Sequence, residues 1–220
     1  MKSIIFSIIA TLALVASPVF AESSYSEIFV FGDSLSDPGN VFVVTGEHSV
    51  RPFNADNIPD APYARGGHHF STGTTWIEQL SADLKLKGGT GPALRTSAFT
   101  HYAFGAARAR MTGVMDLSSQ VGLLLSDMQG NLPADALYSV YVGGNDVRDA
   151  TATFFAVFFN TGDPVAAQLA AEAVVGEAVQ SIADNIMLLT SLGATHFLVP
   201  NVPCLLYTSP SPRDRSAYLV

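Results

Sequence analysis

Cysteine is almost absent from this sequence, whose 220 residues include a single one, Cys204. An internal disulfide is therefore excluded, and no Cys/His cluster has the spacing of a zinc site, so we expect no metal. Charged residues are also few, at 14% of the chain against 48% hydrophobic residues. This balance excludes an intrinsically disordered chain and predicts one folded domain with its own core.

Positive charge is scarce too. The chain has 11 Lys and Arg residues against 19 Asp and Glu residues, a net charge of -8, and no basic run. A phosphate backbone is bound through clustered Lys and Arg side chains, so we expect no nucleic-acid partner.

The N-terminus holds the most continuous apolar run. Lys2 precedes apolar residues 4–16, and small residues lead to Ala21. This pattern predicts a signal peptide over residues 1–21, because a membrane anchor needs about 20 apolar residues and the polar positions leave this run short. We therefore expect a secreted or periplasmic protein with no membrane span after cleavage.

The composition changes abruptly at Cys204. Residues 204–214 read CLLYTSPSPRD, which is similar to a transposase sequencing adapter translated as coding sequence. The alternative is a genuine Ser/Pro-rich tail. We expect residues 204–220 to be non-native, the hydrolase domain to occupy residues 22–203 in incomplete form, and the natural gene to continue differently.

The region between these ends alternates between strand and helix patterns. Continuous apolar runs predict buried strands at residues 28–31, 136–142 and 195–203, with a further strand near 99–104. Helical spacing predicts helices at residues 74–84, 117–128 and 163–193, the last starting at Asp163-Pro164 and stopping at Gly193. The alternation predicts an α/β fold with a parallel sheet between helices and its functional loops at the carboxyl ends of the strands.

Two of those loops carry groups suited to acyl transfer. Ser34 follows the first strand beside Gly32, and Asn145 follows a later strand. A serine held at this edge serves as a nucleophile, and an amide side chain stabilises the oxyanion. Gly-Asp-Ser and Gly-Gly-Asn-Asp are also ordinary turn sequences, so both interpretations stand at this point.

Four segments together resemble the GDSL or SGNH family of esterases and lipases. They are FGDSLSDPGN at residues 31–40, FSTG at 70–73 with Trp76 and Glu78, YAFGAA at 102–107, and YVGGND at 141–146. The resemblance implies a three-layer, flavodoxin-like α/β/α sandwich, with Ser34 as nucleophile and no cofactor. Its oxyanion hole would use the Ser34 N–H, the Asn145 side chain, and the N–H of Gly105 or of Ala106.

The sequence departs from the family in two places. His101 and Ala106 stand where the second block usually has Asn and the second residue of a Gly-Gly pair. The final Asp-x-x-His block is absent, because none of the five histidines, His48, His68, His69, His101 and His196, has an aspartate three positions before it. The catalytic His and Asp are thus not present, so we expect an inactive chain that lacks the last elements of the fold.

The function that these residues predict is an exported serine esterase or lipase acting on a small-molecule or lipid ester. The alternatives are a carbohydrate acetyl esterase or thioesterase of the same fold, or a secreted binding module without catalysis. The aromatic run at residues 154–159 suits either an acyl-binding groove, contact with lipid, or a helix buried on two sides. Asp33 and Asp37 are interpreted as bracing the serine loop, and His68 and His69 as loop residues rather than a metal site.

Overall fold

The computed structural model describes residues 25–46, 68–71, 73–86, 88–89, 91–113 and 115–202. The predicted signal peptide and the predicted non-native tail lie outside the described residues, as does His48.

A parallel sheet forms the centre of the described structure. Its strands are β1 (Ile28–Gly32), β2 (Leu137–Tyr141) and β3 (His196–Leu198), in the order β1-β2-β3. Ile28 lies opposite Leu137, and Leu137 lies opposite His196. The three apolar runs are therefore confirmed as neighbouring parallel strands. The prediction of burial is wrong for β3, where His196 is exposed and Phe197 and Leu198 are only partly buried.

The strand predicted near residues 99–104 is reduced to a single bridge. His101 pairs with Val30 on the free edge of β1 and with Pro92. The Tyr102 N–H donates to the Val30 carbonyl at 2.7 Å, so this segment still follows β1 although it forms no ladder.

Five helices surround the sheet in the described residues. They are α1 (Asn40–Thr45), α2 (Trp76–Asp83), α3 (Leu117–Asp127), α4 (Gly144–Thr161) and α5 (Pro164–Ser191). Side chains cap the three predicted helices: Thr75 forms a capping box with Glu78, and Asp116 and Asp163 accept N–H bonds at the starts of α3 and α5. These helices are confirmed, whereas α1 and α4 were not predicted.

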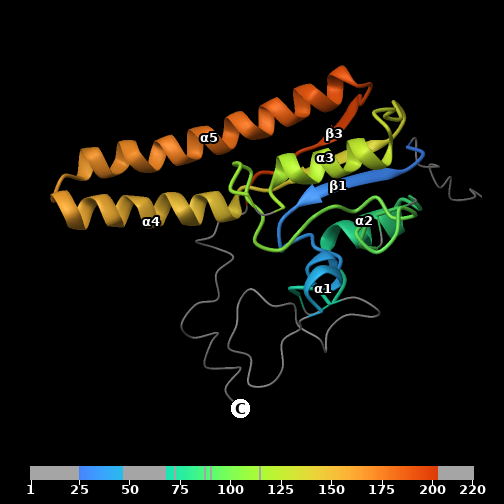
Figure 1. Ribbon diagram of the computed structural model, residues 1–220, viewed down its shortest axis with the longest axis horizontal. Helices are drawn as coiled ribbons and strands as arrows, with labels where there is room; N and C mark the ends of the chain where they lie inside the picture. Colours follow the sequence, from blue (N-terminus) through green and yellow to red (C-terminus); the bar gives the residue numbers. More distant parts are fainter. Residues whose placement is uncertain are drawn as a thin grey trace, which may run out of the picture.

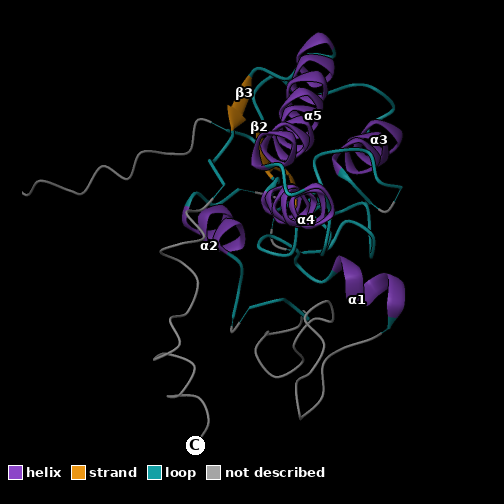
Figure 2. Ribbon diagram, turned by 90° about the vertical axis from the view of Figure 1, so that its left-hand side faces the viewer, coloured by secondary structure: helices purple, strands orange, loops and turns teal. Residues whose placement is uncertain are grey.

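The residues of β1 alternate between two cores, which sets the layers. Phe29 and Phe31 pack with α3 and α5, while Ile28 and Val30 pack with α2 on the other face. Figure 2 shows α2 lying apart from α3 and α5, with strands between them. The α/β fold with a parallel sheet between helical layers is therefore confirmed.

Helices α4 and α5 form an antiparallel hairpin. Gly162, with a φ of 70°, ends α4, and Asp163 caps α5 directly afterwards. Figure 1 shows the hairpin extending beyond the sheet. Phe155 and Phe159 in α4 are 49% and 77% exposed, so the aromatic run does not form a helix buried on two sides.

None of the described helices combines the length and the apolar character needed to cross a membrane.

Candidate active site

The two predicted functional loops meet at the carboxyl end of the sheet. Gly32, the last residue of β1, lies opposite Tyr141, the last residue of β2. The loop after β1 and the start of α4 consequently line one groove of about 570 Å³. Its lining residues are Asp33, Ser34, Leu35, Gly144, Asn145, Arg148, Thr151, Ala152 and Phe155. The structure thus brings Ser34 and Asn145 into the same groove.

Two aspartates hold the serine loop in shape. The Leu35 N–H donates to Asp33 Oδ1 at 3.0 Å, and Asp37 Oδ1 accepts the N–H groups of Gly39 and Asn40 at 2.7 and 2.6 Å. Ser34 remains half-buried between them, and no described residue hydrogen-bonds to its hydroxyl or its N–H. The interpretation of Asp33 and Asp37 as bracing residues is confirmed.

Gly32 fits its position because the backbone of β2 comes close. A Cβ there would lie 2.8 Å from the Tyr141 carbonyl oxygen. The buried Gln120 side chain of α3 accepts the Gly32 N–H and donates to the Gly32 carbonyl, both at 2.9 Å. Sequence reasoning missed Gln120, and a polar residue on the buried face of an amphipathic helix was the signal available.

Trp76 and Asn40 tie this loop to its surroundings. Trp76 Nε1 donates to Ser36 Oγ at 3.0 Å, so the first turn of α2 supports the loop. Asn40 Nδ2 donates to the carbonyls of His101 and Ala103, both at 2.8 Å. The first and second sequence blocks are therefore joined by buried hydrogen bonds.

The two candidate N–H donors of the second block differ in geometry. The Gly105 N–H donates to Asp37 Oδ2 at 2.8 Å, and a Cβ at Gly105 would overlap the Phe70 ring. Ala106 has a φ of 64°, and its N–H has no acceptor among the described residues. Of the two, Ala106 has the N–H left for a ligand.

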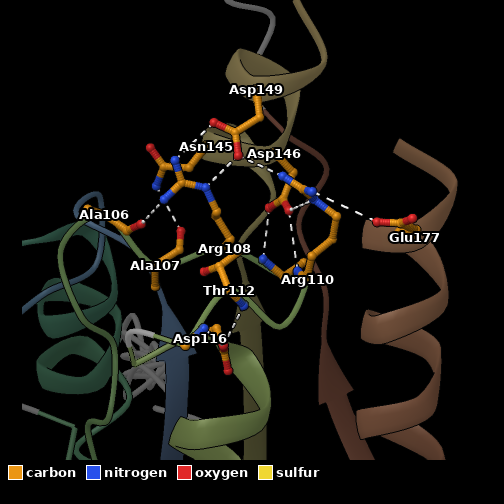
Figure 3. Close-up of polar contacts among 12 residues, drawn as sticks. Ala106, Ala107, Arg108, Arg110, Thr112, Asp116, Asn145, Asp146, Asp149 and Glu177 are labelled. Atoms are coloured by element: carbon orange, nitrogen blue, oxygen red, sulfur yellow. Dashed lines mark hydrogen bonds and ion pairs between the residues drawn. The ribbon is translucent and has the colours of Figure 1, made fainter. Parts of the chain in front are cut away.

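The start of α4 is clamped to the segment that follows Ala106. Asn145 Nδ2 donates to the Ala107 carbonyl at 2.8 Å, and Arg108 Nη1 donates to the Ala106 carbonyl at 3.2 Å. Arg108 in turn binds both carboxylate oxygens of Asp149, as Figure 3 shows. The fork geometry fixes the backbone of residues 106–108 against α4.

A second arginine completes the clamp. Arg110 Nε lies 2.9 Å from Asp146 Oδ1, and Arg110 Nη2 lies 2.6 Å from Asp149 Oδ2 (Figure 3). Asp146 is buried and also accepts the Ala109 N–H at 2.8 Å. Sequence reasoning missed this network, because its arginine and aspartate partners lie 36 to 41 positions apart in the chain and no local pattern links them.

Comparison with known proteins agrees with this geometry. The model of the GDSL-like lipase/acylhydrolase family matches residues 28–219. The chain belongs to this family. A relative, "Lipase 1" from Photorhabdus luminescens, is 27% identical over 198 residues, which make up 87% of this chain and 24% of the relative. The chain thus spans about a quarter of that relative's length.

Membership of the GDSL-like family indicates ester hydrolysis and confirms the resemblance stated from the four blocks. The matched range includes every residue that lines the groove, and it also runs through residues 204–219. Exclusion of that tail from the fold therefore stays a prediction.

Burial sets the electrostatics of this GDSL-like site. It raises the pKa of Asp33 to about 6, with a further contribution from the nearby Asp146 carboxylate. Burial likewise raises the pKa of Asp37 to about 6, although four backbone N–H groups oppose the shift. The Arg108 guanidinium holds the pKa of Asp149 below its usual value, so this carboxylate stays ionised at neutral pH.

The described histidines of this GDSL-like domain do not line the groove. His69 Nε2 is 2.9 Å from Glu78 Oε2, and this pair is buried beside α2. His101 is fully buried, which lowers its pKa to about 3, and His196 is exposed on β3. No described histidine lines the groove at Ser34, and the described residues contain no group of three side chains able to hold a metal ion.

Proposed function

We propose that this domain is a serine esterase in which Ser34 attacks the carbonyl carbon of a carboxylic ester. The observation that carries the proposal is the shared groove, which is lined by both Ser34 and Asn145. Asn145 also binds the Ala107 carbonyl, and the N–H of the preceding residue, Ala106, has no acceptor among the described residues. Ser34 Oγ forms a bond to the acyl carbon as the bond from that carbon to the alcohol oxygen breaks, and the alcohol leaves with the proton of the Ser34 hydroxyl. Water then adds to the acyl carbon, which releases the acid and returns a proton to Ser34.

Three hydrogen-bond donors are available for the oxyanion. The N–H groups of Ser34 and Ala106 have no acceptor among the described residues. Asn145 Nδ2 carries two hydrogens, of which the Ala107 carbonyl accepts one. Fixed donors of this kind stabilise the charge that develops in the transition state.

We further propose that residues 22–220 alone hydrolyse esters slowly. A serine is a weak nucleophile without a neighbouring base, and the sequence has no Asp-x-x-His pair to supply one. Buried His101, with its pKa lowered to about 3, is unsuited to that role.

The proposed substrates are lipid esters or short-chain acyl esters, since the relative that matches is named a lipase. Carbohydrate acetyl esters and thioesters would use the same three donors. We also propose that the protein acts outside the cytoplasm, either secreted or in the periplasm, on the basis of residues 1–21.

Labelling of Ser34 by a fluorophosphonate in the complete gene product tests the nucleophile. Ser34→Ala should lose the label and nearly all turnover of p-nitrophenyl acetate, whereas Ser126→Ala, an exposed serine on α3, should keep both. Labelling that persists in Ser34→Ala would exclude Ser34, and a binding module without catalysis would show no label at all.

Asn145→Ala tests the oxyanion hole in the same assay. It should lower kcat by about 10²–10³ with a smaller change in KM. Asn160→Ala, exposed at the far end of α4, serves as the control. A rise in KM at unchanged kcat would make Asn145 a substrate-binding residue instead.

A further inference from the structure

The groove that begins at Ser34 continues along one face of α4. Its lining residues on this helix include Asn145, Arg148, Ala152 and Phe155, which recur at intervals of three or four. That spacing places them on one side of a helix. From Asn145 to Phe155 the groove follows the helix for about 15 Å, given a rise of about 1.5 Å per residue.

The groove changes character along this path. Its polar groups near the sheet are the Asp33 carboxylate, the Ser34 hydroxyl and the Asn145 amide. Further along α4, the Thr151 hydroxyl also lines the groove and donates to the Val147 carbonyl at 2.9 Å. Most of the remaining surface is apolar, with Leu35, 49% exposed, contributed by the serine loop, and Ala152 and Phe155 by α4. Arg148 adds the methylene stem of an exposed side chain.

The apolar floor extends one helical turn beyond the groove. The rings of Phe155 and Phe159 stack with centroids 6.0 Å apart, and Phe159 is 77% exposed. Figure 1 shows α4, which follows β2 in the chain, starting near the tip of the β1 arrow and running away from the sheet. Exposed aromatic surface that is continuous with a site marks a surface built to be covered.

We propose that this groove binds the acyl chain of a medium- or long-chain straight ester, with the carbonyl at Ser34 and the methyl end toward Phe155. The assignment of the carbonyl end rests on the proposed function. This occupant follows from the way the groove continues from the site. The polar end at the sheet suits the ester carbonyl, and the mostly apolar path along one face of α4 suits a straight hydrocarbon chain.

Binding of straight-chain methyl ketones, from 2-butanone to 2-decanone, tests the proposal by calorimetry on residues 22–220. These probes carry a carbonyl without charge, so Arg148 cannot capture them as an ion pair, and no turnover is needed. Affinity should rise by up to about fourfold with each added methylene. Ala152→Trp, which fills the middle of the groove, should remove this dependence on chain length.

Ala173→Trp provides the matched control, because Ala173 is an exposed helical alanine on α5 that does not line the groove. It should keep the dependence on chain length. Equal affinity for short and long ketones, or a dependence that survives in Ala152→Trp, would overturn the proposal. A third outcome would also overturn the proposal. If the protein forms dimers that Ala152→Trp disrupts, and ketone affinity does not depend on chain length, this face of α4 binds a second copy of the chain.

The two proposals fail separately. If Ser34→Ala keeps the fluorophosphonate label while the ketones still bind by length, the nucleophile is wrong and the groove stands. If Ser34 is labelled while the ketones bind without regard to length, the nucleophile stands and the acyl site is wrong.

Discussion

Ala106 holds a backbone conformation that glycine adopts more readily. Its φ of 64° lies in the left-handed region, where a Cβ meets the following carbonyl oxygen. The family resemblance places a glycine at this position, and the structure supplies the physical reason. The Ala106 N–H has no acceptor among the described residues.

Ala106→Gly should therefore raise the free energy of unfolding by about 1 kcal/mol, after the greater entropy of unfolded glycine is subtracted. Urea unfolding followed by circular dichroism measures the change. Ala156→Gly, at an exposed position within α4, should lower the free energy of unfolding by about 1 kcal/mol. A loss of stability in both variants would contradict the strain assigned to residue 106.

His101 gives the fold a dependence on pH. Burial lowers its pKa to about 3, from an ordinary value of 6.5, so in this range the unfolded chain binds a proton that the folded chain does not. Stability from this group is complete above pH 6.5 and is lost as the pH falls toward 3. Neither ring nitrogen has a hydrogen-bond partner among the described residues.

His101→Asn should remove this dependence. Between about pH 6.5 and pH 5 the wild-type chain should lose about 2 kcal/mol of unfolding free energy relative to the variant. The wild-type chain and the variant have all other titrating groups in common. The contributions of these groups therefore cancel when the unfolding free energies from the two urea titrations are subtracted. A difference that stays constant across this range would show that His101 takes up its proton equally in the folded and unfolded chains, which would contradict the lowered pKa.

At the scale of elements, the clamp between α4 and residues 106–110 holds the two segments that carry Asn145 and Ala106, which we propose as oxyanion donors. Asp149 binds both Arg108 and Arg110, and Arg108 holds the Ala106 carbonyl. Since Arg108 and Asp149 are each about a quarter exposed, the ion pair itself adds about 1 kcal/mol or less to stability. Its larger effect is on position, because small displacements of catalytic groups slow reactions strongly.

Asp149→Ala should therefore lower kcat by up to about 10²-fold in the complete gene product, with KM changing less. Asp149→Glu should restore part of the loss, and Glu177→Ala should have no effect, because Glu177 is 69% exposed and only approaches Arg110 at 3.8 Å. The kinetics of p-nitrophenyl acetate hydrolysis report both constants. An unchanged kcat in Asp149→Ala would show that the clamp does not position the donors.

The elements that sequence reasoning found are those with local signals. Strand β1 is a continuous apolar run, and α5 begins with an aspartate cap followed by proline. Helix α4 was missed because Gly143-Gly144 is typical of a turn, whereas Gly143, with a φ of 123°, is the residue that starts this helix. The exposed aromatic residues of α4 also lack the one-sided pattern of a packed helix.

The residues of the candidate site also divide into those with a local sequence signal, which were predicted, and those without one, which were not. Ser34 and Asn145 follow strands, so topology alone predicts that they meet. The choice between Gly105 and Ala106 depends on a hydrogen bond from Gly105 to Asp37, and the support from Gln120 spans 88 positions of the chain. Long-range contacts of this kind leave no periodic trace in a single sequence.

At the scale of the whole molecule, truncation tests the C-terminal boundary of the domain, which we predict at residue 203. We expect residues 204–220 to contribute nothing to folding, so residues 22–203 and 22–220 should unfold at the same temperature. Both should also turn over p-nitrophenyl acetate far more slowly than the complete gene product. A lower unfolding temperature for residues 22–203 would show that the tail packs against the domain, in line with the range of the family match.

The hairpin of α4 and α5 divides the molecule into regions of unequal local stability. Near the sheet, α5 buries Ala178, Asn185 and Leu189, while Ala167 is the buried residue of its outer half. Local opening costs less where fewer side chains are buried. Amide protons should consequently exchange with deuterium fastest around Gly162 and progressively more slowly toward Leu189, so that the molecule frays from the hairpin tip inward before the sheet opens.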